Sequence, residues 1–174
     1  MSASIWGRCL LLVLLLNAVA GCGYHLTNSS SGRLGSAQKI WVPFFRNESI
    51  SPSAQTVVRR AFYDELHALR GLNPAESEAA ADLVMKAKII SYSSVAVSYN
   101  ALDQAREFKL SLTVEVEIAK KGSALPLWKG QIQADKQYPA SGDLALQRNA
   151  EEQALDAASR IIAHKFISAS EEHY

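Results

Sequence analysis

The chain has 174 residues, with 18 lysines and arginines against 17 aspartates and glutamates, so its formal net charge is +1. Such a balance lacks the basic excess through which proteins bind nucleic acid, and we expect no nucleic-acid partner. The two cysteines, Cys9 and Cys22, and the four scattered histidines have no spacing that suits a zinc site or thiol catalysis. The composition favours one globular domain that needs no metal or other cofactor.

The first 21 residues have the pattern of a secretory signal peptide. Arg8 precedes an apolar run that is too short to span a bilayer, and Val19-Ala20-Gly21-Cys22 resembles a bacterial lipobox. This pattern predicts cleavage before Cys22 and attachment of diacylglycerol and an N-linked acyl chain, such as palmitate, to that cysteine. The alternative is an ordinary signal peptide followed by a cysteine by chance. Residues 22–38 are expected to form a flexible tether, and residues 39–174 a single domain.

Residues 39–45 are expected to form the first strand, because buried and exposed residue types alternate there. Pro43 cannot donate to a ladder, so this strand lies at an edge or ends at the proline. Its inner face is expected to carry Ile40, Val42 and Phe44, and its outer face Lys39, Trp41 and Phe45. A helix follows, with Ser51 as its cap and Gly71 as its stop.

Three further strands are expected near residues 83–97, 108–118 and 127–135, where apolar residues recur at every second position. Their short connections predict an antiparallel meander, and the helix before them predicts a parallel, right-handed crossover from the first strand. A helix with one apolar stripe is expected over residues 143–168. The expected fold class is α/β (α+β), a two-layer sandwich with two helices packed on one face of a four-stranded mixed sheet, in the order β-α-β-β-β-α.

The sequence contains no phosphate loop, nucleophile elbow or metal-binding histidine pair, so we expect no enzyme. Glu115 and Glu117 share one strand face and could act as an acid–base pair in an envelope hydrolase. They alternate with core residues, however, which favours a solvated outer face. Mixed charge and aromatic side chains on that face are typical of a surface that binds a partner. The candidate partner-facing residues are Trp41, Lys86, Lys88, Tyr92, Lys109 and Lys129.

Several stretches of the chain resemble the LptE family of lipopolysaccharide-assembly lipoproteins. They follow the family's order and are Cys22–Leu26, Ile40–Ser49, Ala81–Ser93 and Arg106–Gly130. The resemblance implies an outer-membrane lipoprotein that faces the periplasm and the lumen of the LptD β-barrel. It would plug that barrel, assist its assembly and help to deliver lipopolysaccharide to the outer leaflet. By the same resemblance, Arg148 and Arg106 are the candidate lipopolysaccharide-binding residues.

The alternative function is a periplasmic lipoprotein that activates a peptidoglycan synthase. Such activators often have a long tether that crosses the gap to the cell wall. The flexible stretch Thr27–Ala37 has eleven residues and reaches about 40 Å at most. This short reach favours a partner in the same membrane.

Overall fold

The computed structural model describes Leu34 and residues 38–171. The chain divides into two units, Met1–Ser30 and Ser31–Tyr174, and the described residues belong to the second. The predicted signal peptide, the lipidation site Cys22 and most of the predicted tether therefore lie outside the described residues. The elements of the second unit are β1 (Lys39–Trp41), β2 (Arg46–Asn47), α2 (Ala54–Arg70), β3 (Asn73–Pro74), the 3-10 helix η1 (Glu78–Ala80), β4 (Leu83–Tyr99), β5 (Ala105–Lys120), β6 (Trp128–Pro139) and α3 (Leu144–Glu171).

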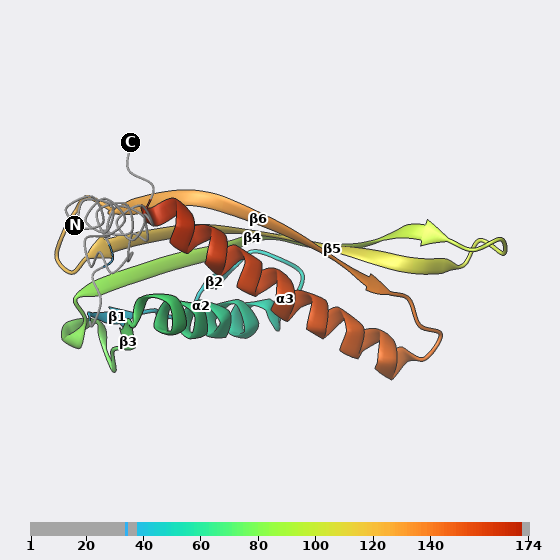
Figure 1. The fold of residues 1–174 in the computed structure, drawn as a ribbon, viewed down its shortest axis with the longest axis horizontal. Helices are drawn as coiled ribbons and strands as arrows, with labels where there is room; N and C mark the ends of the chain where they lie inside the picture. The colour runs from blue at the N-terminus through green and yellow to red at the C-terminus, as the bar shows by residue number, and fades with distance from the viewer. Residues whose placement is uncertain (1–33, 35–37, 172–174) are drawn as a thin grey trace, which may run out of the picture. The chain divides into compact units, whose positions relative to one another are not determined.

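The described unit has two layers, a mixed sheet and the two helices α2 and α3, which lie on the same face of it (Figure 1). The long strands β4, β5 and β6 form the predicted antiparallel meander. The strand β1 pairs in parallel with β4, as the helical crossover predicted. The structure confirms the α+β class, but the sheet has six strands and not four. The additional short strands are β2, which pairs with β4, and β3, which pairs with β1.

The first strand ends at Trp41, just before Pro43, so it stops near the proline as the sequence allowed and does not reach residue 45. The main chain of Val42 is bound by α2: its N–H donates to the Tyr63 hydroxyl at 3.1 Å, and its carbonyl accepts from Arg59 Nε at 2.9 Å. The inward and outward alternation does not continue past the proline. Phe45 is 2% exposed, whereas Phe44 is 71% exposed. The two phenylalanines thus occupy the reverse of their predicted places.

A β-bulge at Ile90 reverses the faces of β4 in its second half. Ile90 has no partner in the pairing with β5, which passes from Ile89 to Ser91. Such a one-residue shift moves the side chains that follow it to the opposite face. Tyr92 therefore points towards the helices, and its predicted position on the outer face is wrong. Val95 and Val97, which regular alternation from Met85 and Ile89 would bury, are 50% and 40% exposed.

The buried core lies between the inner face of the sheet and the two helices. Its centre is an aromatic cluster in which the ring of Phe62 on α2 lies 5.7 Å from that of Phe45 and 5.6 Å from that of Phe166. The Trp128 ring on β6 meets Phe166 edge-on at 5.2 Å. Gly130 makes room for this arrangement, since a Cβ there would lie 2.8 Å from the Trp128 ring.

Helix α2 begins after Ser53 and not at the predicted cap Ser51, and the Ser53 side chain makes no capping hydrogen bond. Its predicted stop is confirmed: Gly71 follows the last helical residue with φ +63° and donates its N–H to the carbonyl of His67. This left-handed conformation favours glycine.

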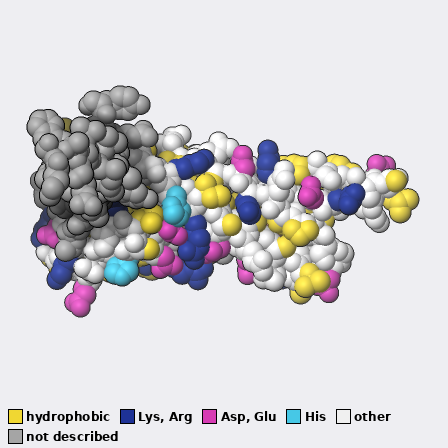
Figure 2. Space-filling model, viewed as in Figure 1, with side chains coloured by type: hydrophobic (Ala, Val, Ile, Leu, Met, Phe, Trp, Pro, Cys, Tyr) yellow, Lys and Arg dark blue, Asp and Glu magenta, His cyan; other side chains and the backbone are white. Residues whose placement is uncertain are grey.

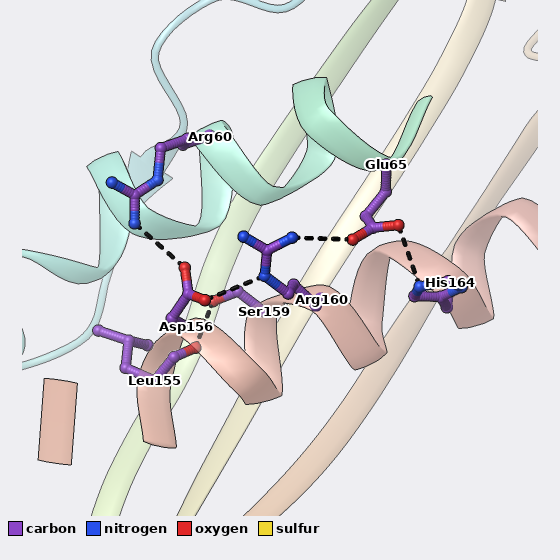
Figure 3. A network of polar contacts seen from close by, with 7 residues as sticks. All are labelled: Arg60, Glu65, Leu155, Asp156, Ser159, Arg160 and His164. Carbon is purple, nitrogen blue, oxygen red and sulfur yellow. Dashed lines mark hydrogen bonds and ion pairs between the residues drawn. The ribbon is translucent and has the colours of Figure 1, made fainter. Parts of the chain in front are cut away.

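A network of charged side chains joins α2 to α3 (Figure 3). Asp156 accepts from Arg60 at 3.1 Å and from Arg160 at 3.0 Å. Arg160 also lies 3.1 Å from Glu65, whose other oxygen is 3.0 Å from His164 Nε2. Glu65 is only 8% exposed, so these partners compensate for the removal of its carboxylate from water. The network fixes how the two helices lie against each other.

Candidate partner-binding surface

The outer face of the sheet is the side on which no described helix packs, and its side chains form rows across β4, β5 and β6. In the first four rows, three basic and three acidic side chains stand among neutral polar groups. These rows are Lys86–Glu117–Lys129, Lys88–Glu115–Gln131, Ser91–Thr113–Gln133 and Ser93–Ser111–Asp135. The charges lie nearest the β5–β6 turn. The face is thus polar and locally balanced in charge.

Ion pairs on this face are exposed and well formed. Lys129 Nζ lies 2.9 Å from Glu117 Oε2, and this hydrogen bond raises the pKa of Lys129. Hydrogen bonds from Ser111 and Gln133 lower the pKa of Asp135. Lys129 and Asp135 are therefore charged at neutral pH. Exposed pairs of this kind contribute little to folding, so their charges remain available to a partner.

The four lysines among the candidate residues, Lys86, Lys88, Lys109 and Lys129, lie on the outer face by strand register. Trp41 lies there as well, half-buried and opposite Val84 in the β1–β4 pairing. Tyr92 does not, because of the bulge at Ile90. Figure 2, viewed as Figure 1 with α3 in front of the strands, shows that basic and acidic side chains are also interspersed over the helical side of the unit.

The structure brings Arg106 and Arg148 to the same end of the unit. Arg106 lies at the start of β5, where its carbonyl accepts from the N–H of Ala140 at 2.8 Å. Ala140 leads directly into α3, whose second turn carries Arg148. Both arginine side chains are exposed. This end, where β6 passes into α3, is the candidate anion-binding end.

Arg148 lines a pocket of about 130 Å³ between the start of α2, the start of α3 and β4. The other lining residues are Ser51, Ser53, Tyr92, Glu151, Glu152 and Leu155. The Tyr92 hydroxyl donates to the Glu151 carboxylate, and burial together with this hydrogen bond raises the pKa of Tyr92. Two carboxylates therefore flank the one arginine. An anion would have to meet Arg148 on its solvent side, away from these acids.

The sequence reasoning missed Tyr138, a buried residue at this end. Its ring stacks on Phe108 with centroids 5.6 Å apart, and its hydroxyl lies 2.6 Å from Ser94 Oγ. Burial raises the pKa of Tyr138. The signal was present: Tyr138 continues the two-residue period of Ile132 and Ala134, but the strand was predicted to end at residue 135.

The model of the family described as "LptE: Lipopolysaccharide-assembly" matches residues 37–170. The chain belongs to the LptE family. The match covers most of the chain and confirms the resemblance. LptE proteins are non-enzymatic lipopolysaccharide-assembly lipoproteins, which confirms that the chain is not an enzyme and that it acts in lipopolysaccharide transport. No curated protein sequence matches the chain significantly.

Several solved structures, two of them of lipoproteins, have a similar fold. A putative lipoprotein from Caulobacter crescentus is 13% identical, with a TM-score of 0.52 over 73% of this chain and 87% of that one. The rare lipoprotein B from Shewanella oneidensis is 15% identical, with a TM-score of 0.51 over 75% and 92%. PelC from Paraburkholderia phytofirmans, solved as a dodecamer, is 15% identical, with a TM-score of 0.53 over 82% and 96%. At these identities the likeness concerns the fold alone.

Within the described part of the LptE-family chain, no helix is both long enough and apolar enough to cross a membrane. Nor do its described histidine and acidic side chains gather into a group that could hold a metal ion. Membership of the family does not by itself give a role to the polar outer face of this chain or to its arginine-bearing end.

Proposed function

We propose that this LptE-family chain binds inside an LptD-type outer-membrane β-barrel and contacts lipopolysaccharide there. In this proposal Cys22 carries the acyl chains that anchor it to the outer membrane, and the domain faces the periplasm and the barrel lumen. The chain would both plug the barrel and assist its assembly. The observation that carries the proposal is the outer sheet face, which is polar and balanced in charge and to which no described helix is packed.

The chemistry of a barrel lumen suits such a face. The inner walls of outer-membrane barrels are polar, because lipid-facing and lumen-facing residues alternate along each strand. The rows headed by Lys86 and Lys88 present both signs of charge within two strand spacings. They could meet opposite charges on a polar wall. The neutral row through Thr113 would lie at the centre of the contact.

The direct test of the partner is affinity purification of the tagged chain from detergent-solubilised outer membranes. We expect a large β-barrel protein in equal amount. Thr113→Arg places bulk and charge at the centre of the outer face and should reduce barrel recovery at least tenfold. Ser168→Arg, an exposed position on α3, is the matched control and should leave recovery unchanged. Recovery of peptidoglycan synthases without a barrel would support the alternative function and overturn the proposal.

The lipopolysaccharide contact is assigned to Arg148, with Arg106 as a second basic group at the same end. A guanidinium can bind a lipid A phosphate through two parallel hydrogen bonds. The neighbouring Glu152 opposes this interaction, so the proposal predicts opposite effects for the two residues. Arg148→Glu should weaken lipopolysaccharide binding, whereas Glu152→Gln should strengthen it.

Titration of the purified variants with lipopolysaccharide tests this assignment. Lys120→Glu makes the same change in charge at an exposed position at the end of β5 and is the control. Equal effects of Arg148→Glu and Lys120→Glu would show that only net charge matters and would remove Arg148 from the site. Barrel recovery should be normal for all three variants.

A further inference from the structure

The second half of β4, residues Ser91–Tyr99, has a strand partner on one side only (Figure 1). On the other side β4 pairs with β1 and then with β2, and the last backbone bond there runs from the N–H of Glu48 to the carbonyl of Ile89 at 3.0 Å. No other strand within residues 38–171 continues this pairing. Alternate peptide groups of this segment therefore face away from β5 without a ladder partner in this part of the chain, regularly from Ser91 to Ala96 and less regularly beyond it, where the pairing with β5 shifts. We call this segment the open edge.

The open edge carries none of the charged residues or prolines that block many edge strands, although its pairing with β5 is irregular beside Val97 and Ser98. Its sequence, SYSSVAVSY, contains no charged residue, proline or glycine, whereas exposed edges usually carry lysine or proline. The opposite edge of the same sheet, β6, has this protection. It contains Lys136 and Pro139, and Lys165 of α3 donates to the carbonyl of Gln133 at 2.8 Å. The chain thus protects one edge of its sheet and leaves the other available for pairing.

The open edge also exposes apolar side chains on the outer face. Val95 and Val97 are about half-exposed, Tyr99 is 59% exposed and Leu102 lies exposed in the adjoining turn. Exposed apolar groups beside unpaired peptide groups are what a second strand would cover. Backbone hydrogen bonds and side-chain burial would then act together.

We propose that the open edge binds a second copy of this chain through antiparallel pairing of the two β4 strands about a two-fold axis. One register brings like residues together. In it, Ala96 lies opposite Ala96 of the second copy, Val95 opposite Val97, and Ser94 opposite Ser98. Opposed residues lie on the same face of the joined sheet, so the exposed valines cover each other on the outer face.

The absence of charge in the open edge favours a second copy of the chain as its binding partner. A two-fold axis places the segment against itself, so any charged residue near the axis would face a like charge. The open edge has no charged residue, and its five residues Ser94–Ser98 read the same in both directions about Ala96. A single strand pair is smaller than the roughly 1,200–2,000 Å² of a stable interface. The dimer is therefore expected to be weak and dependent on concentration.

Disulfide cross-linking tests the register in the full-length chain, purified in detergent. Directly opposed residues of antiparallel strands have Cα atoms about 4.5–5.5 Å apart, which suits a disulfide. Ala96→Cys should therefore give a band of twice the chain mass under oxidising, non-reducing conditions. Gln131→Cys on β6 and the unaltered chain are the controls. Cross-linking of Ala96→Cys no greater than that of Gln131→Cys, or only to a different protein, overturns the proposal.

Sedimentation over a range of concentrations tests the charge argument without an added thiol. Val95→Lys places two like charges beside the axis and should weaken self-association at least tenfold. Val95→Thr keeps the shape and the β-propensity and should change it less than threefold. Thermal unfolding checks that both variants fold, which is expected because Val95 is half-exposed. A monomer at all concentrations, or association unaffected by Val95→Lys, contradicts the proposal.

Discussion

The reversal of Phe44 and Phe45 can be tested by replacing each with alanine. Phe45 is fully enclosed, and its ring meets that of Phe62 edge-on at 5.7 Å. Removing a buried phenylalanine side chain costs about 3–5 kcal/mol, because the cavity left behind closes only partly. Phe44 is exposed, and its ring lies 4.8 Å from the Arg59 guanidinium. Losing a cation–π contact at an exposed site costs about 0.5–1 kcal/mol.

These free energies correspond to clearly different melting temperatures. For a domain of this size, each kcal/mol lowers Tm by about 4 °C. Phe45→Ala should therefore lower Tm by roughly 12–20 °C, and Phe44→Ala by about 2–4 °C. Circular dichroism melts and urea titrations of the two purified variants measure both values. The two substitutions remove the same atoms from adjacent residues, so each is a control for the other.

Equal losses of stability, or a larger loss for Phe44→Ala, would refute this reasoning. Such a result would mean that the strand alternation continues through Pro43 and that Phe44 is the residue buried in the core. An unchanged slope of unfolding free energy against urea is also expected, because neither substitution alters the area exposed on unfolding by much.

Three further predictions concern single residues. Gly71→Ala should cost about 1 kcal/mol in urea unfolding, because alanine is strained at φ +63° although its Cβ would meet no neighbour. Burial raises the pKa of Asp156, but hydrogen bonds from Arg160 and Arg60 lower it by more, so its net pKa lies below the ordinary value. The charged carboxylate therefore stabilises the fold at pH values above the pKa of the unfolded chain, and this stability is lost as the pH falls through the folded pKa. Asp156→Asn should lower Tm at pH 7, and by less as the pH falls below about 4. Lys129→Met removes an exposed ion pair and should change stability by less than about 0.5 kcal/mol at any salt concentration.

Hydrophobic periodicity predicted the layers of this fold because each long element buries one face. The alternation from Leu110 to Ile118 and the helical stripe from Leu155 to Phe166 are all buried as expected. The meander followed from the short connections between the last three strands, and the parallel crossover followed from the helix between the first two. The short strands β2 and β3 were missed, because two-residue pairings leave no period in a sequence.

The errors in the facing of side chains occur where the backbone departs from a regular repeat. Pro43 and the bulge at Ile90 each shift the alternation by one residue, which moves the following side chains to the other face. The bulge at Ile90 cannot be read from the residues themselves, since LVMKAKIISYSSVAV alternates acceptably in either register. The placement of Tyr92 on the outer face failed for this reason. The four lysines lie on the outer face as predicted, because the bulge does not affect them. Lys86 and Lys88 precede it on β4, and Lys109 and Lys129 lie on other strands.

The bulge at Ile90 also connects the two surfaces discussed above. Before it, β4 is flanked on both sides, and its outer face carries charged side chains. After it, Tyr92 and Ser94 turn inwards and form hydrogen bonds with Glu151 and Tyr138. In this second half, no described strand pairs with β4 on the side away from β5. The inward hydroxyl groups contribute hydrogen bonds where regular alternation would have placed valines in the core. We infer that this part of β4 contributes less to the core than it could, and that its exposed valines are retained for pairing with another strand.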